Sequence, residues 1–118
     1  MGALKQEILQ VHECKEHVVL ENESYCVSLL KFTHPREFVI CSSETKRNCS
    51  TQDIVEIFTC MEEFIKNNPE VSPCYFLIDV TKTDAFTLQQ LSMAADAFKK
   101  VKSFMETRLV GTVVKAGD

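Results

Sequence analysis

The sequence predicts an α/β fold built on one mixed sheet, and three patterns support this prediction. The first third of the chain contains apolar runs of strand length that are separated by polar turns. An apolar stripe with spacings of three and four residues then indicates a packed helix. The segment "CYFLIDV" at 74–80 is almost continuously apolar, which is typical of a strand covered on both faces in a parallel sheet.

The first predicted element is an antiparallel hairpin. In "HVVLENESYCVSLLKF" at 17–32, an apolar run precedes a polar turn, and Tyr25, Val27 and Leu29 then alternate with other residues. After "THPR", the segment "EFVICSS" indicates another strand, because a proline favours an extended conformation just before it. Before residue 17 the pattern fits either a helix or a strand.

A first long helix is predicted over about 51–66. Its apolar residues recur at spacings of four, three and four: Ile54, Phe58, Met61 and Ile65. Ser50 is the expected N-cap, Asp53 places negative charge in the first turn, and "NNP" at 67–69 ends the helix.

A second helix is predicted over about 88–106, followed by a strand at "LVGTVV". Thr87 and Gln90 have the spacing of a capping box, and Phe86 and Leu91 that of a hydrophobic staple. The expected buried face consists of Leu88, Leu91, Ala95, Phe98, Val101 and Met105. Either the N-terminal segment covers the remaining face of the sheet or the chain is truncated at its C-terminus, and we favour truncation.

Length and charge limit the function. A chain of 118 residues fits a single domain spanning 1–118. Its formal net charge of −4 repels phosphate backbones, so nucleic acid is not an expected partner. The sequence has no signal peptide pattern and no apolar run long enough for a membrane span, so we expect a cytoplasmic protein with six reduced cysteines.

The order of the elements resembles the STAS domain, named for sulfate transporters and anti-sigma-factor antagonists, and in particular the small STAS/SEC14-like proteins. The resemblance spans roughly residues 17–114, and its most specific part is "YFLIDVTKTDAFTLQQL" at 75–91. It implies a non-enzymatic regulatory or binding domain that recognises a partner protein or an apolar ligand. In that family a final helix, and often a last strand, follow the last strand predicted here.

The expected binding crevice follows the central strand, because open α/β sheets bind ligands at the carboxyl ends of their strands. Its predicted residues are Asp79, Thr81, Lys82, Thr83, Asp84, Phe86 and Thr87. No glycine-rich loop connects a strand to a helix, so a phosphate cradle has no support and we expect no cofactor. The oligomeric state stays open.

A second hypothesis is a small enzyme or a phospho-switch that uses Asp79, Asp84, Thr87 or Cys49. Phosphorylatable STAS domains carry an Asp-Ser-Ser-Gly type sequence at the start of this helix, and the matching letters here are "DAFT" at 84–87. Both serine positions are replaced, so we prefer Thr87 as a cap and Asp79 as an acceptor of N–H bonds from its own loop. Cys49 precedes a helix N-terminus that would favour a thiolate, although a packing role is preferred.

The cluster "HECKEH" at 12–17 is the densest group of metal-ligand residue types. His12, Cys14 and His17 lack the second ligand pair that closes most zinc sites. We therefore expect no metal, and two histidines exposed to solvent on a strand.

Overall fold

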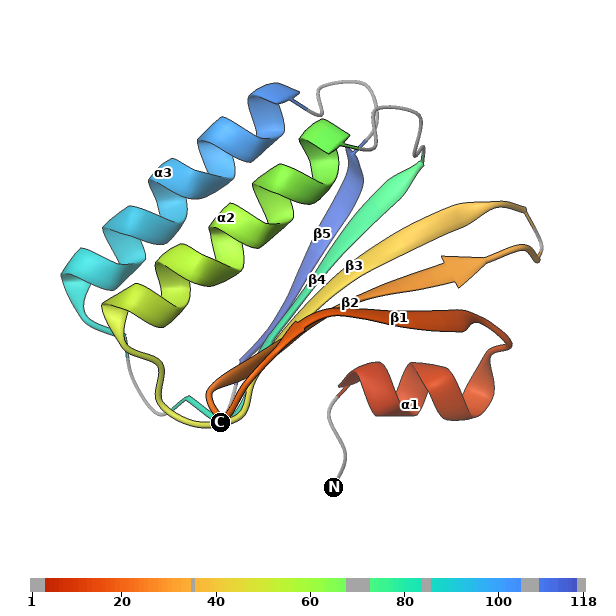
Figure 1. Cartoon of the computed structure of the whole chain (residues 1–118), viewed down its shortest axis with the longest axis horizontal. Coiled ribbons are helices and arrows are strands. Elements are labelled where there is room, and N and C mark those ends of the chain that lie inside the picture. The colour runs from red at the N-terminus through yellow and green to blue at the C-terminus, as the bar shows by residue number, and fades with distance from the viewer. Residues whose placement is uncertain (1–3, 35, 68–72, 84–85, 105–108, 117–118) are drawn as a thin grey trace.

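The structure is a computed structural model that describes residues 4–34, 36–67, 73–83, 86–104 and 109–116. These residues form one five-stranded sheet in the order β1-β2-β3-β4-β5, together with three helices (Figure 1). The strands are β1 Lys15–Glu21, β2 Tyr25–Phe32, β3 Phe38–Thr45, β4 Cys74–Val80 and β5 Leu109–Ala116. The helices are α1 Leu4–Val11, α2 Thr51–Asn67 and α3 Leu88–Phe104. The predicted α/β class is confirmed.

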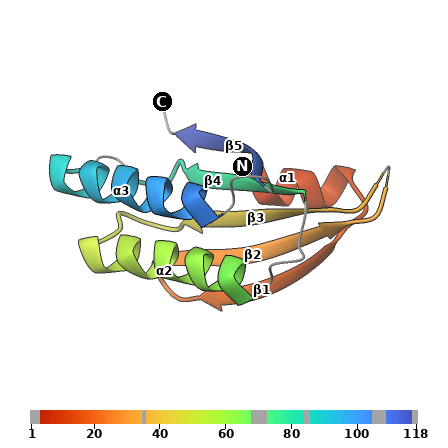
Figure 2. The ribbon, with the colours of Figure 1, turned by 90° about the horizontal axis from the view of Figure 1, so that it is seen from above.

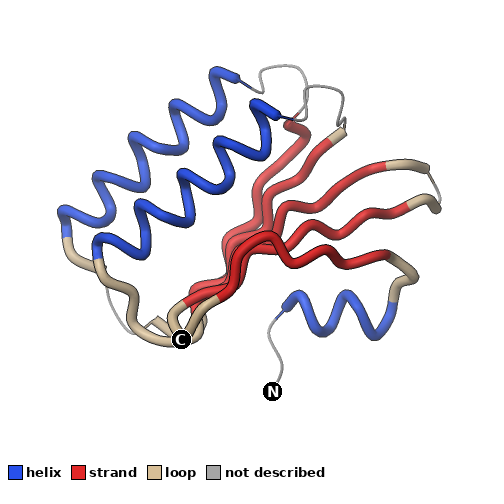
Figure 3. The backbone as a smooth tube through the Cα atoms, in the orientation of Figure 1, coloured by secondary structure: helices blue, strands red, loops and turns tan. Residues whose placement is uncertain are grey.

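The sheet combines an antiparallel start with a parallel centre, as predicted. Strands β1, β2 and β3 pair antiparallel, whereas β4 pairs parallel with both β3 and β5. The "CYFLIDV" strand is therefore an interior strand between two parallel neighbours. Figure 3 shows the twisted sheet between a layer of two long helices and the short N-terminal helix.

Helices α2 and α3 lie side by side on one face of the sheet, and α1 lies on the opposite face (Figures 1 and 2). The main core fills the space under α2 and α3. It consists of Tyr25, Val27, Leu29, Val39, Cys41, Ile57, Met61, Cys74 and Phe76. The rings of Phe58 and Phe98 pack edge to face with centroids 5.1 Å apart, which joins the two helices.

The predicted start of α2 is confirmed by reciprocal capping bonds. The Asp53 backbone N–H donates to Ser50 Oγ at 3.1 Å, and the Ser50 N–H donates to Asp53 Oδ2 at 2.9 Å. Ile54 and Met61 are buried on the inner face as expected. The Ile65 side chain lies outside the described part of the helix.

Helix α1 is attached to the second face of the sheet through Lys5, which is 4% exposed. Lys5 Nζ forms ion pairs with Glu16 at 2.7 Å and Glu44 at 3.2 Å, and it donates to Ser28 Oγ at 3.3 Å. Burial by itself would lower the pKa of Lys5, but the two carboxylates reverse this effect and raise it. A buried lysine is tolerated because it is fully paired.

The N-terminus of α1 is held by a bond to a distant strand. The Leu4 backbone N–H donates to Asp79 Oδ2 at 2.9 Å, so a carboxylate on β4 occupies the place of an N-terminal cap. Isolated helices of eight residues are marginal in water. The contacts of Lys5 and Asp79 therefore keep this segment helical and resolve the ambiguity between helix and strand.

The predicted buried face of α3 is confirmed at Phe98 but wrong at Leu88, Leu91 and Ala95. Leu88 is 86% exposed, Leu91 is 52% exposed and Ala95 is also exposed. The inner face carries Gln90 and the partly buried Ala94 and Phe98. The Gln90 side chain donates to the Cys49 carbonyl at 3.2 Å, and this bond to the α2 entry loop turns that face inward. Val101 and Met105 lie outside the side chains that the structure describes.

A charge at Leu77 tests the position of β4. Leu77 is 5% exposed, whereas Val113, its register partner on β5, is 56% exposed. We expect Leu77→Asp to lower the free energy of unfolding by roughly 3 kcal/mol or more, because it buries a charge without a partner. Val113→Asp is the matched control and should cost about 1 kcal/mol or less. Equal urea midpoints for the two variants would show that β4 is not an interior strand.

Candidate ligand-binding crevice

A cavity of about 200 Å³ opens between the sheet and helices α2 and α3. It lies where β3, β4 and β5 end, the position at which open α/β sheets place their ligands. The sheet contributes Ser43, Thr45, Ile78, Asp79, Val80 and Val114 to its lining. The helices and the loop before α3 contribute Ile54, Ile57, Phe58, Phe86, Gln90, Leu91, Ala94 and Phe98.

The polar side chains of the lining are mostly bonded to other parts of the protein. Thr45 Oγ1 accepts a bond from Thr83 Oγ1 at 2.9 Å, and it donates to the Asp79 carbonyl at 3.5 Å. Gln90 is held by Thr87 and by the Cys49 carbonyl. Within the described residues Ser43 Oγ has no hydrogen-bond partner, so it is the one lining hydroxyl left for a ligand. The remaining wall is apolar.

The crevice reaches solvent between α3 and β5. Leu91 on α3 is 52% exposed and Val114 on β5 is 58% exposed, and both belong to the lining. Apolar side chains that are this exposed and border a cavity are typical of a binding site. A ligand that entered here would cover them.

The structure brings two of the predicted crevice residues, Asp79 and Phe86, to the cavity wall. Three others have different positions: Lys82 is exposed, Thr83 is buried, and Thr81 bonds to the Asp79 carboxylate. Thr87 caps α3 from outside the lining. Asp84 lies outside the described residues. Sequence reasoning missed the residues from β3 and α2, because the pattern of one segment does not show which distant elements face it.

Asp79 is a structural acceptor in this arrangement. It is 2% exposed, and besides the Leu4 N–H it accepts bonds from the Thr81 N–H at 3.1 Å and Thr81 Oγ1 at 2.7 Å. Burial opposes ionisation, but these bonds and the nearby Lys115 outweigh it and lower the pKa of Asp79. A carboxylate that is held so firmly in its charged form is a poor general base.

Thr83 and Thr87 also have structural roles. Thr83 Oγ1 donates to Thr45 Oγ1, and the Arg47 carbonyl lies 3.2 Å from the same hydroxyl. The Gln90 N–H donates to Thr87 Oγ1 at 3.1 Å, and the Thr87 N–H donates to Gln90 Oε1 at 3.1 Å. The predicted capping box is confirmed, and the hydroxyl considered for phosphorylation is bonded to the backbone.

Cys49 does not have the surroundings of a nucleophile. It is 8% exposed, and burial together with Asp53 raises the pKa of its thiol against the opposing effect of Arg47. The thiol therefore stays protonated near pH 7 and points toward the Ser24 carbonyl at 3.7 Å. All six cysteines are free thiols.

Within the described ranges, no group of three or more His, Cys, Asp or Glu side chains has the geometry to hold a metal ion. His12 follows α1 and His17 lies on β1, and both are exposed. None of the helices in the described part of the chain has the length and apolar character needed to cross a membrane.

Comparisons of the chain with protein-family models, with curated proteins and with solved structures found no match.

The capping role of Thr87 can be measured. Thr87→Ala removes the side-chain acceptor and should lower the free energy of unfolding by about 1 kcal/mol, while Thr87→Ser and Thr87→Asp should retain most of the stability. Ser92→Ala, at an exposed site within α3, serves as the control and should change stability by less than about 0.5 kcal/mol. Thermal melts of the four variants check this order. A fully stable Thr87→Ala protein with altered partner binding would instead support the phospho-switch.

Proposed function

We propose that this protein is a non-enzymatic binding domain whose ligand is a small, neutral, apolar molecule held in the crevice. The main observation is the character of the wall. Ile54, Ile57, Phe58, Phe86 and Phe98 surround the space. The carboxylate of the lining residue Asp79 is bonded to Thr81 and to Leu4 of α1, which lies on the opposite face of the sheet. Such a wall favours apolar surface and penalises a charged ligand.

The volume supports a small ligand. An apolar cavity of about 150 Å³ in another protein is known to hold benzene. The crevice, at about 200 Å³ and open on one side, has room for a single ring or a short alkyl chain. Ser43 Oγ offers one hydrogen bond, so a hydroxyl or carbonyl group on the ligand fits better than a pure hydrocarbon.

A regulatory role within the cell belongs to the same proposal. The order of strands and helices, with a crevice beside the loop after β4, supports the resemblance to STAS domains. In such a domain, ligand occupancy would alter the surface formed by that loop and the start of α3. The enzyme hypothesis has no comparable support, because Asp79, Thr87 and Cys49 each have a structural role.

Titration with n-octanol and two charged analogues tests the proposal. We expect saturable binding of n-octanol with NMR shifts at the Phe58 and Phe98 rings. Octanoate and octylammonium should bind at least roughly tenfold more weakly, because each would bury a charge. Equal binding of the three compounds would contradict a neutral apolar site.

Two variants and one control locate the binding. Ala94→Phe fills the cavity and should weaken n-octanol binding at least roughly tenfold, given the apolar area that the ligand then loses. Leu91→Ser changes the exposed mouth without entering the core and should weaken binding to a smaller extent. Leu88→Ser lies on the same helix outside the lining and should leave binding unchanged. Unaltered n-octanol binding by a folded Ala94→Phe protein would place the ligand elsewhere.

A further inference from the structure

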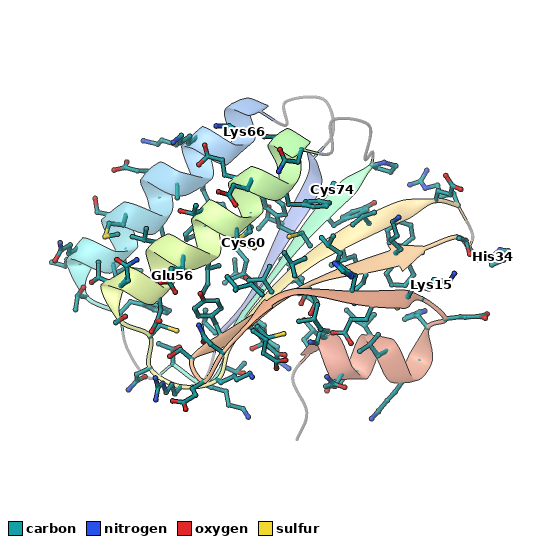
Figure 4. The ribbon with its side chains drawn as sticks, viewed as in Figure 1. Lys15, His34, Glu56, Cys60, Lys66 and Cys74 are labelled. Carbon is teal, nitrogen blue, oxygen red and sulfur yellow. The ribbon has the colours of Figure 1, made fainter. Side chains whose placement is uncertain are left out.

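A second concave surface lies on the outer side of the molecule, between β1 and α2, away from the crevice. It encloses about 590 Å³ and is bordered by Val19 and Leu20 of β1 and by Val55 of α2. These three side chains are 38%, 37% and 38% exposed. We call this surface the β1–α2 groove. Figure 4 marks Glu56 and Cys60 on the helix that forms one of its walls.

The apolar wall of the groove depends on a β-bulge. The register between β1 and β2 shifts between Val18 and Leu20, so Val19 is an extra residue in the strand. In a regular strand, neighbouring side chains point to opposite faces. The bulge allows Val19 and Leu20 to border the same groove. In a strand without the bulge, Val19 and Leu20 would point to opposite faces of the sheet and could not form this exposed apolar pair.

The charge of the groove has one sign. Glu56 and Glu63 both border it, and among the described residues no Lys, Arg or His side chain does. Glu56 accepts bonds from Tyr25 Oη at 2.6 Å and Gln52 Nε2 at 3.4 Å, which are both neutral donors. In the described part of the chain neither glutamate forms an ion pair, although Glu21, Glu44 and Glu62 elsewhere do. The groove therefore carries two carboxylates without a cationic partner.

We propose that the β1–α2 groove binds a segment of a partner protein that carries apolar side chains flanked by lysine or arginine. Apolar residues of the segment cover Val19, Leu20 and Val55, and its cations approach Glu56 and Glu63. The net charge of −4 on this chain makes a basic partner more favourable than a second copy. The bulge at the sheet edge disfavours strand addition, so side-chain contacts provide the affinity.

Three short peptides serve as probes of the groove: an alternating leucine–lysine heptapeptide, its leucine–glutamate counterpart and a serine–lysine counterpart. We expect the leucine–lysine peptide to bind in a fluorescence anisotropy titration, with amide shifts that cluster at Val19, Leu20 and Val55. Raising NaCl from about 50 mM to about 300 mM should weaken this binding, because exposed ion pairs are screened. The other two peptides should bind at least roughly tenfold more weakly.

Substitutions in the groove separate the contribution of its carboxylates to peptide binding from that of its apolar side chains. Glu56→Gln and Glu63→Gln should each weaken the binding of the leucine–lysine peptide by up to roughly fivefold, which is the range expected for the loss of an exposed ion pair. Leu20→Ser, with Val55→Ser as a second variant at an exposed helix site, should weaken it by roughly tenfold. Glu7→Gln and Leu88→Ser are matched controls, since both residues are exposed and neither lines the groove, and they should bind as the wild type does.

Three results would overturn the proposal. One is equal binding of the serine–lysine and leucine–lysine peptides, which would indicate charge alone. Another is a loss of affinity in the control variants as large as that in Leu20→Ser. The third is a dimer seen by sedimentation that Leu20→Ser dissociates, which would assign the groove to a second copy of the chain. Because n-octanol binding in the crevice is measured separately, failure of the groove proposal leaves the proposed function untouched.

Discussion

The ion pairs of the buried Lys5 ammonium group hold helix α1 against the sheet. The covering of the sheet on both faces depends on them. Helix α1 has eight residues, so it needs external contacts to persist, and the ion pairs to Glu16 and Glu44 join it to β1 and β3. The Asp79 carboxylate adds a bond from β4 to the first turn of the helix. Because α1 covers part of this face, Leu77 of β4 is buried on the side opposite to α2 and α3. The central strand can therefore be apolar on both sides.

The same arrangement explains why the loop after β4 is structural. Asp79 bonds to α1 and to its own loop, and Thr83 ties that loop to Thr45 on β3. Thr87 begins α3 with a capping box. With these polar groups occupied, the described part of the loop contributes an apolar side chain, Phe86, to the crevice. Recognition of a charged partner is consequently proposed at the β1–α2 groove, where neither Glu56 nor Glu63 forms an ion pair with another described residue.

The fold could be predicted from the sequence wherever the decisive interactions are local. The hairpin, the capped start of α2 and the "CYFLIDV" strand each depend on residues close in the chain. The buried face of α3 was misassigned because Leu88 and Leu91 have helical spacing, while Gln90 turns inward through a bond to the Cys49 carbonyl, 41 residues away. The burial of Lys5 was missed for the same reason, since its partners belong to separate strands. Of the crevice, the sequence indicated the β4 loop but not the contributions of β3 and α2.

Amide hydrogen exchange in Lys5→Met tests most directly whether this charge cluster holds α1 on the sheet. Removing the ammonium group leaves two carboxylates without their cation, a change that typically costs about 3 kcal/mol, or roughly 100-fold in protection. We expect the α1 amides to lose protection by about this factor, while the β2 and β4 amides stay protected. The control variant Lys82→Met, at an exposed site, should change the protection of neither group. Unchanged protection of α1 in Lys5→Met would contradict this role of Lys5.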